Sequence, residues 1–419
     1  MPSLDPISPR RNEPAEAGSD DEADPELVEL LRQHLGLSGK PVKALPPETK
    51  VLENAQYVFD NAIDVALSPS QTKEAAEFIW RLMQKKAYST QTWSEHELHP
   101  KTKDESTVDF IFTMDLLNFS FWSEEDESKR FSIEYRGKRW TGYWSLVAAL
   151  QRALDEDIPI TTPDFWLDET ECTEGLLKHV FRSATDEEIP LFKERVKCLR
   201  EAGEVLCNEF GGSFANVIDS ADYSAAGLVN LLVESFACFR DEAVFNGRRV
   251  RLYKRAQILV ADLWACFNGE DFGEFHDIDK ITMFADYRIP QILHQLGCLR
   301  YSPPLESHIR SLKPITPGSN WEIELRGTSI WGVELIKREI EKRHPEVKTA
   351  DMKGGAKPDE NHETLDPEAT AETETEEKPQ KTYGINAILI DFFLYDTMKS
   401  LEEENNESIP HHRTRSIWY

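Results

Sequence analysis

The sequence lacks the short motifs that identify many nucleotide-binding and hydrolytic enzymes. It contains no GxGxxG, no GxxxxGKS/T, no GxSxG and no HExxH, so it does not indicate a dinucleotide fold, a P-loop, a serine hydrolase or a zincin. Its six cysteines form no CxxC pair, which is typical of reduced thiols in a cytoplasmic or nuclear protein. We expect no cofactor and a cytoplasmic or nuclear localisation.

Signals for export, membrane insertion and metal binding are also missing. The chain starts without the basic region and apolar run of a signal peptide. Asp262 and Asp391 interrupt the two longest apolar stretches, which stay short of the ~18 residues of a membrane span. His96 and His99 have the wrong spacing for a zincin helix, and Pro100 ends their segment. We therefore expect no membrane span and no metal site.

Positive charge is scarce. The chain has 48 Lys and Arg against 76 Asp and Glu, and a net charge of −28. Contacts with nucleic-acid phosphates and with anionic membranes both need a basic face. We therefore expect a small-molecule partner, with neither a stable nucleic-acid partner nor a membrane. We also expect a monomer.

Two acidic stretches contain too few apolar residues to form a core. Residues 1–27 hold eight acids against two arginines, and residues 351–380 hold ten acids against three lysines. Burial of so little apolar surface does not offset the entropy of ordering. We therefore predict a disordered tail over 1–45 and a disordered insertion over 351–380. One domain would comprise 46–350 and 381–419.

The rest of the chain shows mostly helical periodicity. Apolar residues at helical spacing predict helices over 49–66, 71–86, 143–155, 190–209, 223–236, 256–267, 288–298, 328–343 and 385–400. Alternation around Ile133, followed by Arg136-Gly137, predicts a β-hairpin, and Asn246-Gly247 predicts a second one. The predicted class is mainly α with a small β-hairpin element.

Two aspartates interrupt the apolar helix predicted near the C-terminus. Asp396 falls inside the apolar stripe of 385–400, and Asp391 lies about 140° around the helix from it. A buried carboxylate is costly unless it is paired. Either Arg413 or Arg415 pairs with them, or the two acids line a pocket for a cationic or amine-bearing ligand.

Asp286 stands just before another predicted helix, which has Pro290 in its first turn and Gly297 at its end. It is either an ordinary N-cap, worth about 1 kcal/mol, or an ionised carboxylate placed to stabilise a developing cation. In both cases amide donors and the helix dipole would favour its ionised form.

Aromatic and basic residues offer two further candidates. Aromatic side chains crowd 118–122 and 140–144, which suits either a stacking surface for a planar base or a hydrophobic core. Lys254 and Arg255 stand at a predicted helix start, where they could be solvated charges or hold a phosphate group. For Asp262, on the same helix, we expect a structural role.

Several long segments, taken together, resemble the queuosine salvage family of queuosine 5′-phosphate N-glycosylase/hydrolases. The resemblance covers about residue 49 to the C-terminus, excluding 351–380. It rests on TMDLLNFSFWSEEDE (113–127), YRGKRWTGYWSL (135–146), RALDEDIPIT (152–161), YKRAQILVAD (253–262), ITMFADYRIPQIL (281–293), ELRGTSIWGVELI (324–336) and the helix of Asp391 and Asp396.

The resemblance implies a mainly helical domain similar to helix-hairpin-helix DNA glycosylases. It implies release of queuine from queuosine 5′-monophosphate, with a catalytic carboxylate at Asp286. The positions implied to contact queuine are His96, Phe284, Asp286, Asp391, Phe392 and Asp396. Many family members have Tyr where this chain has Phe392, so a contact through that hydroxyl is lost here.

The implied chemistry suits these residues. Cleavage of the C1′–N9 bond develops positive charge on the ribose, which Asp286 could stabilise or attack as a nucleophile. The leaving base has carbon in place of N7 and cannot be activated there. Lys254 and Arg255 are candidates for the 5′-phosphate on charge alone. A non-catalytic queuine-binding module and a helical scaffold without a pocket are the alternatives.

Overall fold

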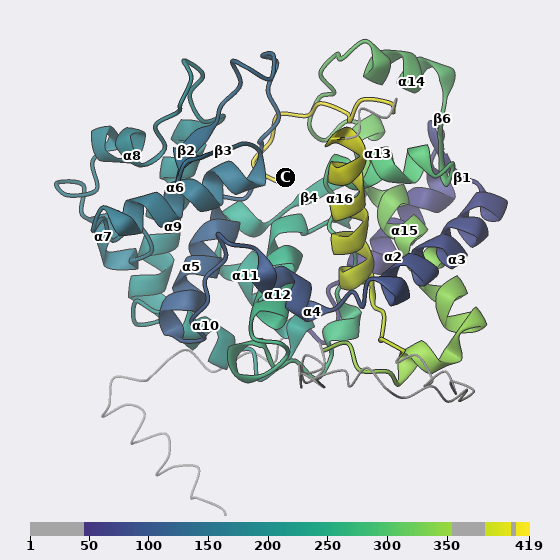
Figure 1. Ribbon diagram of the computed structural model, residues 1–419, viewed down its shortest axis with the longest axis horizontal. Coiled ribbons are helices and arrows are strands. Elements are labelled where there is room, and N and C mark those ends of the chain that lie inside the picture. The colour runs from purple at the N-terminus through teal and green to yellow at the C-terminus, as the bar shows by residue number, and fades with distance from the viewer. Residues whose placement is uncertain (1–45, 354–381, 404–407) are drawn as a thin grey trace, which may run out of the picture. The chain divides into compact units, whose positions relative to one another are not determined.

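The computed structural model describes residues 46–353, 382–403 and 408–419 (Figure 1). Two buried helices, α12 (Lys254–Cys266) and α15 (Asn320–Arg343), organise this part of the chain. Further helices are α2 (Val51–Asn61), α3 (Pro69–Lys85), α4 (Thr90–Glu95), α5 (Glu105–Leu116), α6 (Tyr143–Asp155), α7 (Pro163–Leu167), α8 (Glu174–Val180), α9 (Phe192–Glu209), α10 (Ala215–Asp219), α11 (Ala225–Ser235), α13 (Arg288–Gln295), α14 (Pro303–Arg310) and α16 (Ala387–Glu403).

The packing of these helices confirms the predicted mainly α class. Helix α15 contacts α2, α3, α13 and α16, while α12 contacts α4, α5 and α11. Helix α16 stands between α5 and α6 on one side and α3 and α15 on the other (Figure 1). None of the described helices is long and apolar enough to cross a membrane. The similarity to helix-hairpin-helix glycosylases stays a prediction.

The two predicted acidic stretches fall mostly outside the described residues. This holds for the tail over 1–45 and for 354–380 of the insertion. The first three residues of the predicted insertion are described and touch the helical body. The amide of Thr90 donates to the carbonyl of Met352, and the ammonium of Lys353 lies 3.8 Å from Glu270.

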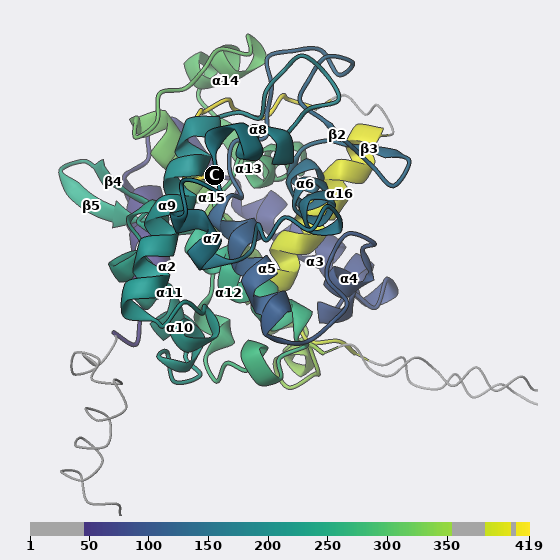
Figure 2. The ribbon, with the colours of Figure 1, turned by 90° about the vertical axis from the view of Figure 1, so that its left-hand side faces the viewer.

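Both predicted β-hairpins are confirmed. Strand β2 (Ile133–Tyr135) pairs with β3 (Lys138–Trp140), and β4 (Glu242–Phe245) pairs with β5 (Arg248–Arg251). The two turn residues of each hairpin have positive φ, 48° at Asn246 and 77° at Gly247 in the second, as a primed turn requires. Figure 2 shows that the β4–β5 hairpin extends to the side opposite α16.

A third strand pair corrects the helix predicted over 49–66. Helix α2 ends at Asn61, and β1 (Val65–Leu67) pairs antiparallel with the distant β6 (Leu299–Tyr301). The carboxylate of Glu324 on α15 accepts bonds from the amides of Ile63, Asp64 and Val65 at 3.0, 2.6 and 3.1 Å. A strand of three residues is too short to show an alternating pattern. Its partner also lies more than 200 residues away, so no local signal predicts the pair.

Two buried arginines hold the segment that follows α5. The Arg195 guanidinium donates to the carbonyls of Leu117 and Phe119, and that of Arg255 donates to the carbonyls of Leu116 and Cys238. Positive charge at the C-terminal end of α5 also complements its helix dipole. The two side chains therefore set where the chain turns after α5.

A third buried arginine joins elements far apart in the sequence. The Arg326 guanidinium on α15 contacts Asp241 at 2.5 and 3.0 Å and Glu322 at 3.1 Å. Its Nε donates to the carbonyl of Ala285 at 2.8 Å, and its guanidinium carbon lies 4.3 Å from the ring centroid of Tyr419. All three charged groups are almost completely buried.

We predict that Arg326→Met lowers the free energy of unfolding by roughly 3–5 kcal/mol, because it leaves two buried carboxylates without their cation. Urea unfolding monitored by circular dichroism measures the change. The control is Arg310→Met, which removes an exposed pair with Glu306 on α14 and should change the free energy by less than about 1 kcal/mol. Equal effects of both substitutions would contradict the prediction.

Candidate active site

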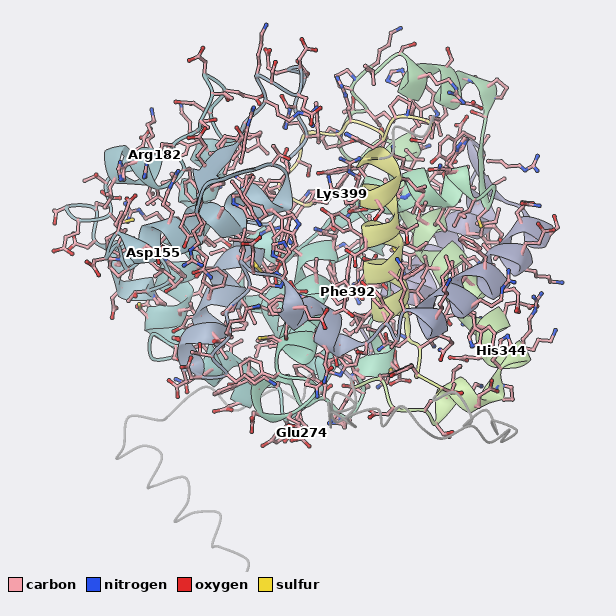
Figure 3. The ribbon with its side chains drawn as sticks, viewed as in Figure 1. Asp155, Arg182, Glu274, His344, Phe392 and Lys399 are labelled. Carbon is pink, nitrogen blue, oxygen red and sulfur yellow. The ribbon has the colours of Figure 1, made fainter. Side chains whose placement is uncertain are left out.

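A cavity of about 950 Å³ opens between α16 and the elements that face it. Its lining residues are Leu312 and residues from segments within 88–99, 118–130, 141–144, 254–262, 284–291, 391–399 and 410–419. Phe392 and Lys399, which line it, are labelled on the flank of α16 that faces α6 in Figure 3. Most of the predicted site residues line this cavity, namely His96, Lys254, Phe284, Asp286, Asp391, Phe392 and Asp396.

The structure places Arg255 elsewhere. It is not part of the cavity lining, and its side chain is almost completely buried. The guanidinium lies 5.0 Å from the ring centroid of Phe119 and 4.9 Å from that of Phe239, and its two terminal nitrogens donate to main-chain carbonyls. The predicted phosphate contact by Arg255 is therefore corrected to a structural role.

Asp286 is held at the start of α13. Tyr287 stands at the N-cap position, and Asp286 precedes it, yet Oδ1 of Asp286 accepts bonds from the amides of Arg288 at 2.8 Å and Ile289 at 2.9 Å, as a capping side chain does. Behind it, the carbonyl of Ala285 accepts the bond from Arg326. The two amides of α13 thus hold the carboxyl group itself, and Arg326 holds the main chain of the residue before it.

The electrostatic setting of Asp286 differs from the expectation in one respect. Burial raises its pKa, and the Lys254 ammonium and the two α13 amides oppose that rise without cancelling it. We expected the amide donors to dominate and favour the ionised form. A partly buried carboxylate of this kind is stabilised when a positive charge develops beside it, because fewer water molecules compete for it than at the surface.

The two aspartates of α16 both reach the cavity but bind different partners. Oδ2 of Asp391 accepts a bond from the amide of Phe284 at 3.0 Å, and Oδ2 of Asp396 accepts one from the Tyr88 hydroxyl at 2.5 Å. Burial raises the pKa of Asp391 well above its usual range, and nearby Asp286 adds to that rise. Burial also raises the pKa of Asp396, against the lowering effect of Tyr88.

Arg415 does not pair with these two acids. Its guanidinium donates to the Trp122 carbonyl at 2.7 Å and lies 3.6 Å from the centroid of that ring. Arg413 lines the cavity, but the described residues contain no ion pair between it and either acid of α16. The alternative in which the acids line a pocket is therefore the one that the geometry favours.

Aromatic rings form the wall opposite α16. The ring of His96 stacks on Trp144 at 3.3 Å, and that of His99 stacks on Trp93 at 3.7 Å. Nε2 of His99 lies 2.9 Å from the Tyr143 hydroxyl. Burial lowers the pKa of both histidines, that of His99 to about 3. Among the described residues no group of three His, Cys, Asp or Glu side chains could hold a metal ion.

Residue-level prediction missed several lining residues. His411 and Tyr419 come from the C-terminal segment, whose approach to the cavity has no local sequence signal, and Arg413 of that segment was considered only as a partner of the two acids of α16. Asp262 could have been found, because Lys254 and Asp262 are eight residues apart and share one face of α12 with Ile258 between them. All three line the cavity.

Comparison with known proteins gives one consistent result. A family model described as "Queuosine salvage protein" matches residues 98–419. A Schizosaccharomyces pombe protein is 41% identical over 385 residues, covering 88% of this chain and all of the relative. A Bos taurus protein is 39% identical, covering 88% and 98%, and one from Sphaerobacter thermophilus is 36% identical, covering 78% and 86%. All three are named queuosine 5′-phosphate N-glycosylase/hydrolase.

We predict that Asp391→Asn stabilises the fold at alkaline pH. The folded protein binds the Asp391 proton more tightly than the unfolded chain does, so this contribution to stability is fully present below the unfolded pKa of about 4 and is lost as pH rises through the folded pKa. Asparagine avoids that loss and keeps an acceptor for the Phe284 amide. Urea unfolding at pH 5 and pH 8 should show a gain of about 1–3 kcal/mol at pH 8 and a smaller one at pH 5.

The matched control is Asp219→Asn, at an exposed position on α10. It should change the free energy of unfolding by less than about 0.5 kcal/mol at either pH. A gain from Asp391→Asn that is as large at pH 5 as at pH 8 would show that ionisation of Asp391 is not its cause.

Proposed function

Because this chain belongs to the queuosine salvage protein family, we propose that it is an enzyme that hydrolyses the N-glycosidic bond of queuosine 5′-monophosphate and releases queuine. The observation that carries the proposal is the position of Asp286, which lines the cavity, is partly buried and is held by two amides. The products would be queuine and ribose 5-phosphate. The monomeric state and the cytoplasmic or nuclear localisation stay predictions.

In the proposed reaction the C1′–N9 bond breaks, and its electron pair leaves with the base. Positive charge then develops on the ribose, next to the Asp286 carboxylate. The carboxylate either stabilises that charge or bonds to C1′. In both routes one water molecule supplies the hydroxyl group to C1′ and its remaining proton to the base. Lys254 favours the ionised form of Asp286 that both routes need.

The acids of α16 suit the side chain of queuine. That side chain carries a secondary amine, which is cationic near neutral pH, and a cyclopentenediol. Asp391 is buried, whereas Asp396 is exposed in the cavity. Neither forms an ion pair within the described residues, so the ligand itself would supply the cation that the two carboxyl groups lack. The centroid of the Phe392 ring lies 5.9 Å from that of Phe284. This ring offers an apolar surface at the position where many family members would have a tyrosine hydroxyl.

For the 5′-phosphate we propose Arg413, with Arg288 and His411 beside it. All three line the cavity, and both arginines lower the pKa of His411, after the larger effect of burial. Nδ1 of His411 lies 2.8 Å from the His412 carbonyl, which can only accept, so Nδ1 carries the proton. Lys254 is a weaker candidate than predicted, because carboxyl groups already surround its ammonium.

We predict that Asp286→Asn lowers kcat for queuine release at least about 100-fold, because the transition state loses its counter-charge. Asparagine keeps an oxygen acceptor for the two α13 amides, so the melting temperature should stay close to that of the wild type. Chromatography of the free base measures turnover. Turnover like that of the wild type would refute the catalytic role of Asp286.

The same assay distinguishes the alternatives. If the wild-type protein releases no base but queuine raises its melting temperature, the protein is a binding module. If queuine has no effect on stability either, it is a scaffold.

We predict that Arg413→Gln raises KM for the 5′-monophosphate roughly 10- to 100-fold, the size of a lost hydrogen bond to a charged group. The Arg413 carbonyl, which accepts from the Ile315 amide at 2.7 Å, remains in place. kcat/KM for unphosphorylated queuosine should not change, and neither should any constant in the exposed control Arg300→Gln. An equal loss with both substrates would exclude a phosphate contact.

A further inference from the structure

The C-terminal segment 408–419 borders the cavity without forming a helix, and Arg413 forms a single bridge with residue 314. Its side chains alternate in burial: Thr414 and Ser416 are buried, whereas Arg413 and Arg415 are partly exposed. Such alternation is typical of an extended chain, in which residues two apart share one face. The two arginines therefore lie on the same face of the segment.

Both arginines lie against one aromatic ring, that of Trp122. The guanidinium carbon of Arg415 is 3.6 Å from the centroid of this ring, and that of Arg413 is 5.7 Å from it. The main chain between them is bound to the same side chain, because Nε1 of Trp122 donates to the carbonyl of Thr414 at 2.9 Å. Trp122 thus contacts three successive residues of the C-terminal segment.

The two guanidinium groups differ in what else they bind. Arg415 donates through Nη1 to the Trp122 carbonyl at 2.7 Å and to the Ser120 hydroxyl at 3.2 Å, and it does not line the cavity. Arg413 lines the cavity, and within the described residues its guanidinium has no ion pair and no hydrogen bond. Contact with the face of a ring leaves the N–H donors at the edge of a guanidinium available to other acceptors. Arg415 therefore fixes the wall, while the donors of Arg413 remain for a ligand.

The main chain on either side of Arg413 is held by two further elements. The Arg413 carbonyl accepts from the amide of Ile315 at 2.7 Å, and the carbonyl of Ile409 accepts from Nε2 of Gln291 on α13 at 2.9 Å. These bonds fix the backbone and do not involve the guanidinium group. Its place in the cavity wall is therefore set by the contact with Trp122.

Two cations on one ring suit an anionic ligand. Among the residues that the structure describes, neither Arg413 nor Arg415 has a carboxylate as an ion-pair partner. Like charges two residues apart repel each other, and a bound anion relieves that repulsion through charge-assisted hydrogen bonds. The 5′-phosphate of the proposed substrate is such an anion.

We propose that Trp122 is the positioning residue that makes the enzyme selective for a 5′-phosphorylated substrate. Clamped by Arg415, its ring holds the guanidinium of Arg413 at the cavity wall and leaves the guanidinium donors available to the phosphate. The proposal rests on the proposed function, which supplies the substrate and the contact with Arg413. It adds the residue that builds the phosphate site.

The first test compares Trp122→Leu with Trp122→Phe in the full-length protein. Leucine removes the aromatic face, whereas phenylalanine keeps it and loses only the indole N–H. We expect Trp122→Leu to raise KM for queuosine 5′-monophosphate roughly 3- to 30-fold, the range of a cation–π contact. Trp122→Phe should restore most of that loss. kcat/KM for unphosphorylated queuosine should not change in either variant.

A double mutant separates positioning from a general structural effect. If Trp122 acts through Arg413, adding Trp122→Leu to Arg413→Gln should raise KM hardly more than Arg413→Gln alone, because residues that serve one interaction are not additive. Effects that multiply, or an equal loss with the phosphorylated and the unphosphorylated substrate, would overturn the proposal.

Arg415→Met tests the clamp without changing a residue that lines the cavity, and it decides the matter if Trp122→Leu does not fold. It should raise KM for the 5′-monophosphate roughly 2- to 10-fold and leave kcat/KM for queuosine unchanged. The matched control is Arg338→Met on α15, which removes a guanidinium 5.0 Å from the ring centroid of Trp331, outside the cavity lining. The control should change neither constant, and equal effects of both substitutions would contradict the proposal.

Calorimetric titration with ribose 5-phosphate measures the phosphate contact without turnover. The dissociation constant should rise in Trp122→Leu and in Arg415→Met, and Trp122→Phe should stay close to the wild type. Failure of the wild-type protein to release queuine would count against the proposed function and leave this titration valid. If the wild type does not bind ribose 5-phosphate, or binds it no better than the two weakened variants, the role of Trp122 is refuted.

Discussion

The buried guanidinium of Arg326 is the interaction on which the site depends. It joins Asp241, which also accepts a bond from the amide of Lys254 at 3.1 Å, to the carbonyl of Ala285, the residue before Asp286. The ring of Tyr419, from the C-terminal segment, covers its face. One side chain of α15 thus positions the start of α12, the residue before the proposed catalytic carboxyl group and the end of the chain. A charge so deeply buried is tolerated only because every polar neighbour is matched.

The cavity combines this rigid support with carboxyl groups whose ionised forms few protein groups stabilise. Burial raises the pKa values of Asp286, Asp391 and Asp396, and the protein partners that oppose the rise are few: Lys254, main-chain amides and the Tyr88 hydroxyl. Such an arrangement lowers the stability of the empty protein. It also strengthens the interaction with a cationic ligand or transition state, because little water must be displaced from the acids when the positive charge arrives.

Local sequence patterns predicted the features that local interactions control. The two hairpins follow from turn residues that accept positive φ, and the helix starting near Asp286 follows from a capping acid and Pro290. The β1–β6 pair was missed because its partners are distant in sequence. The structural role of Arg255 was also missed, since the charge of a side chain does not reveal that main-chain carbonyls of α5 and Cys238 will bind it.

The sequence by itself determined the mainly α class and the family, because periodicity, turn residues and long family segments are properties of the linear chain. The residues that would carry the chemistry stay a prediction. Only the tertiary structure decided which charges meet. It brought Lys254 into one cavity with Asp286 and Asp391, left Arg255 outside that cavity and placed Arg413 in it. The physical reason is that ionisation and pairing depend on burial and distance in space, and residues from α5, α12, α13 and α16 converge on one cavity only after the helices have packed.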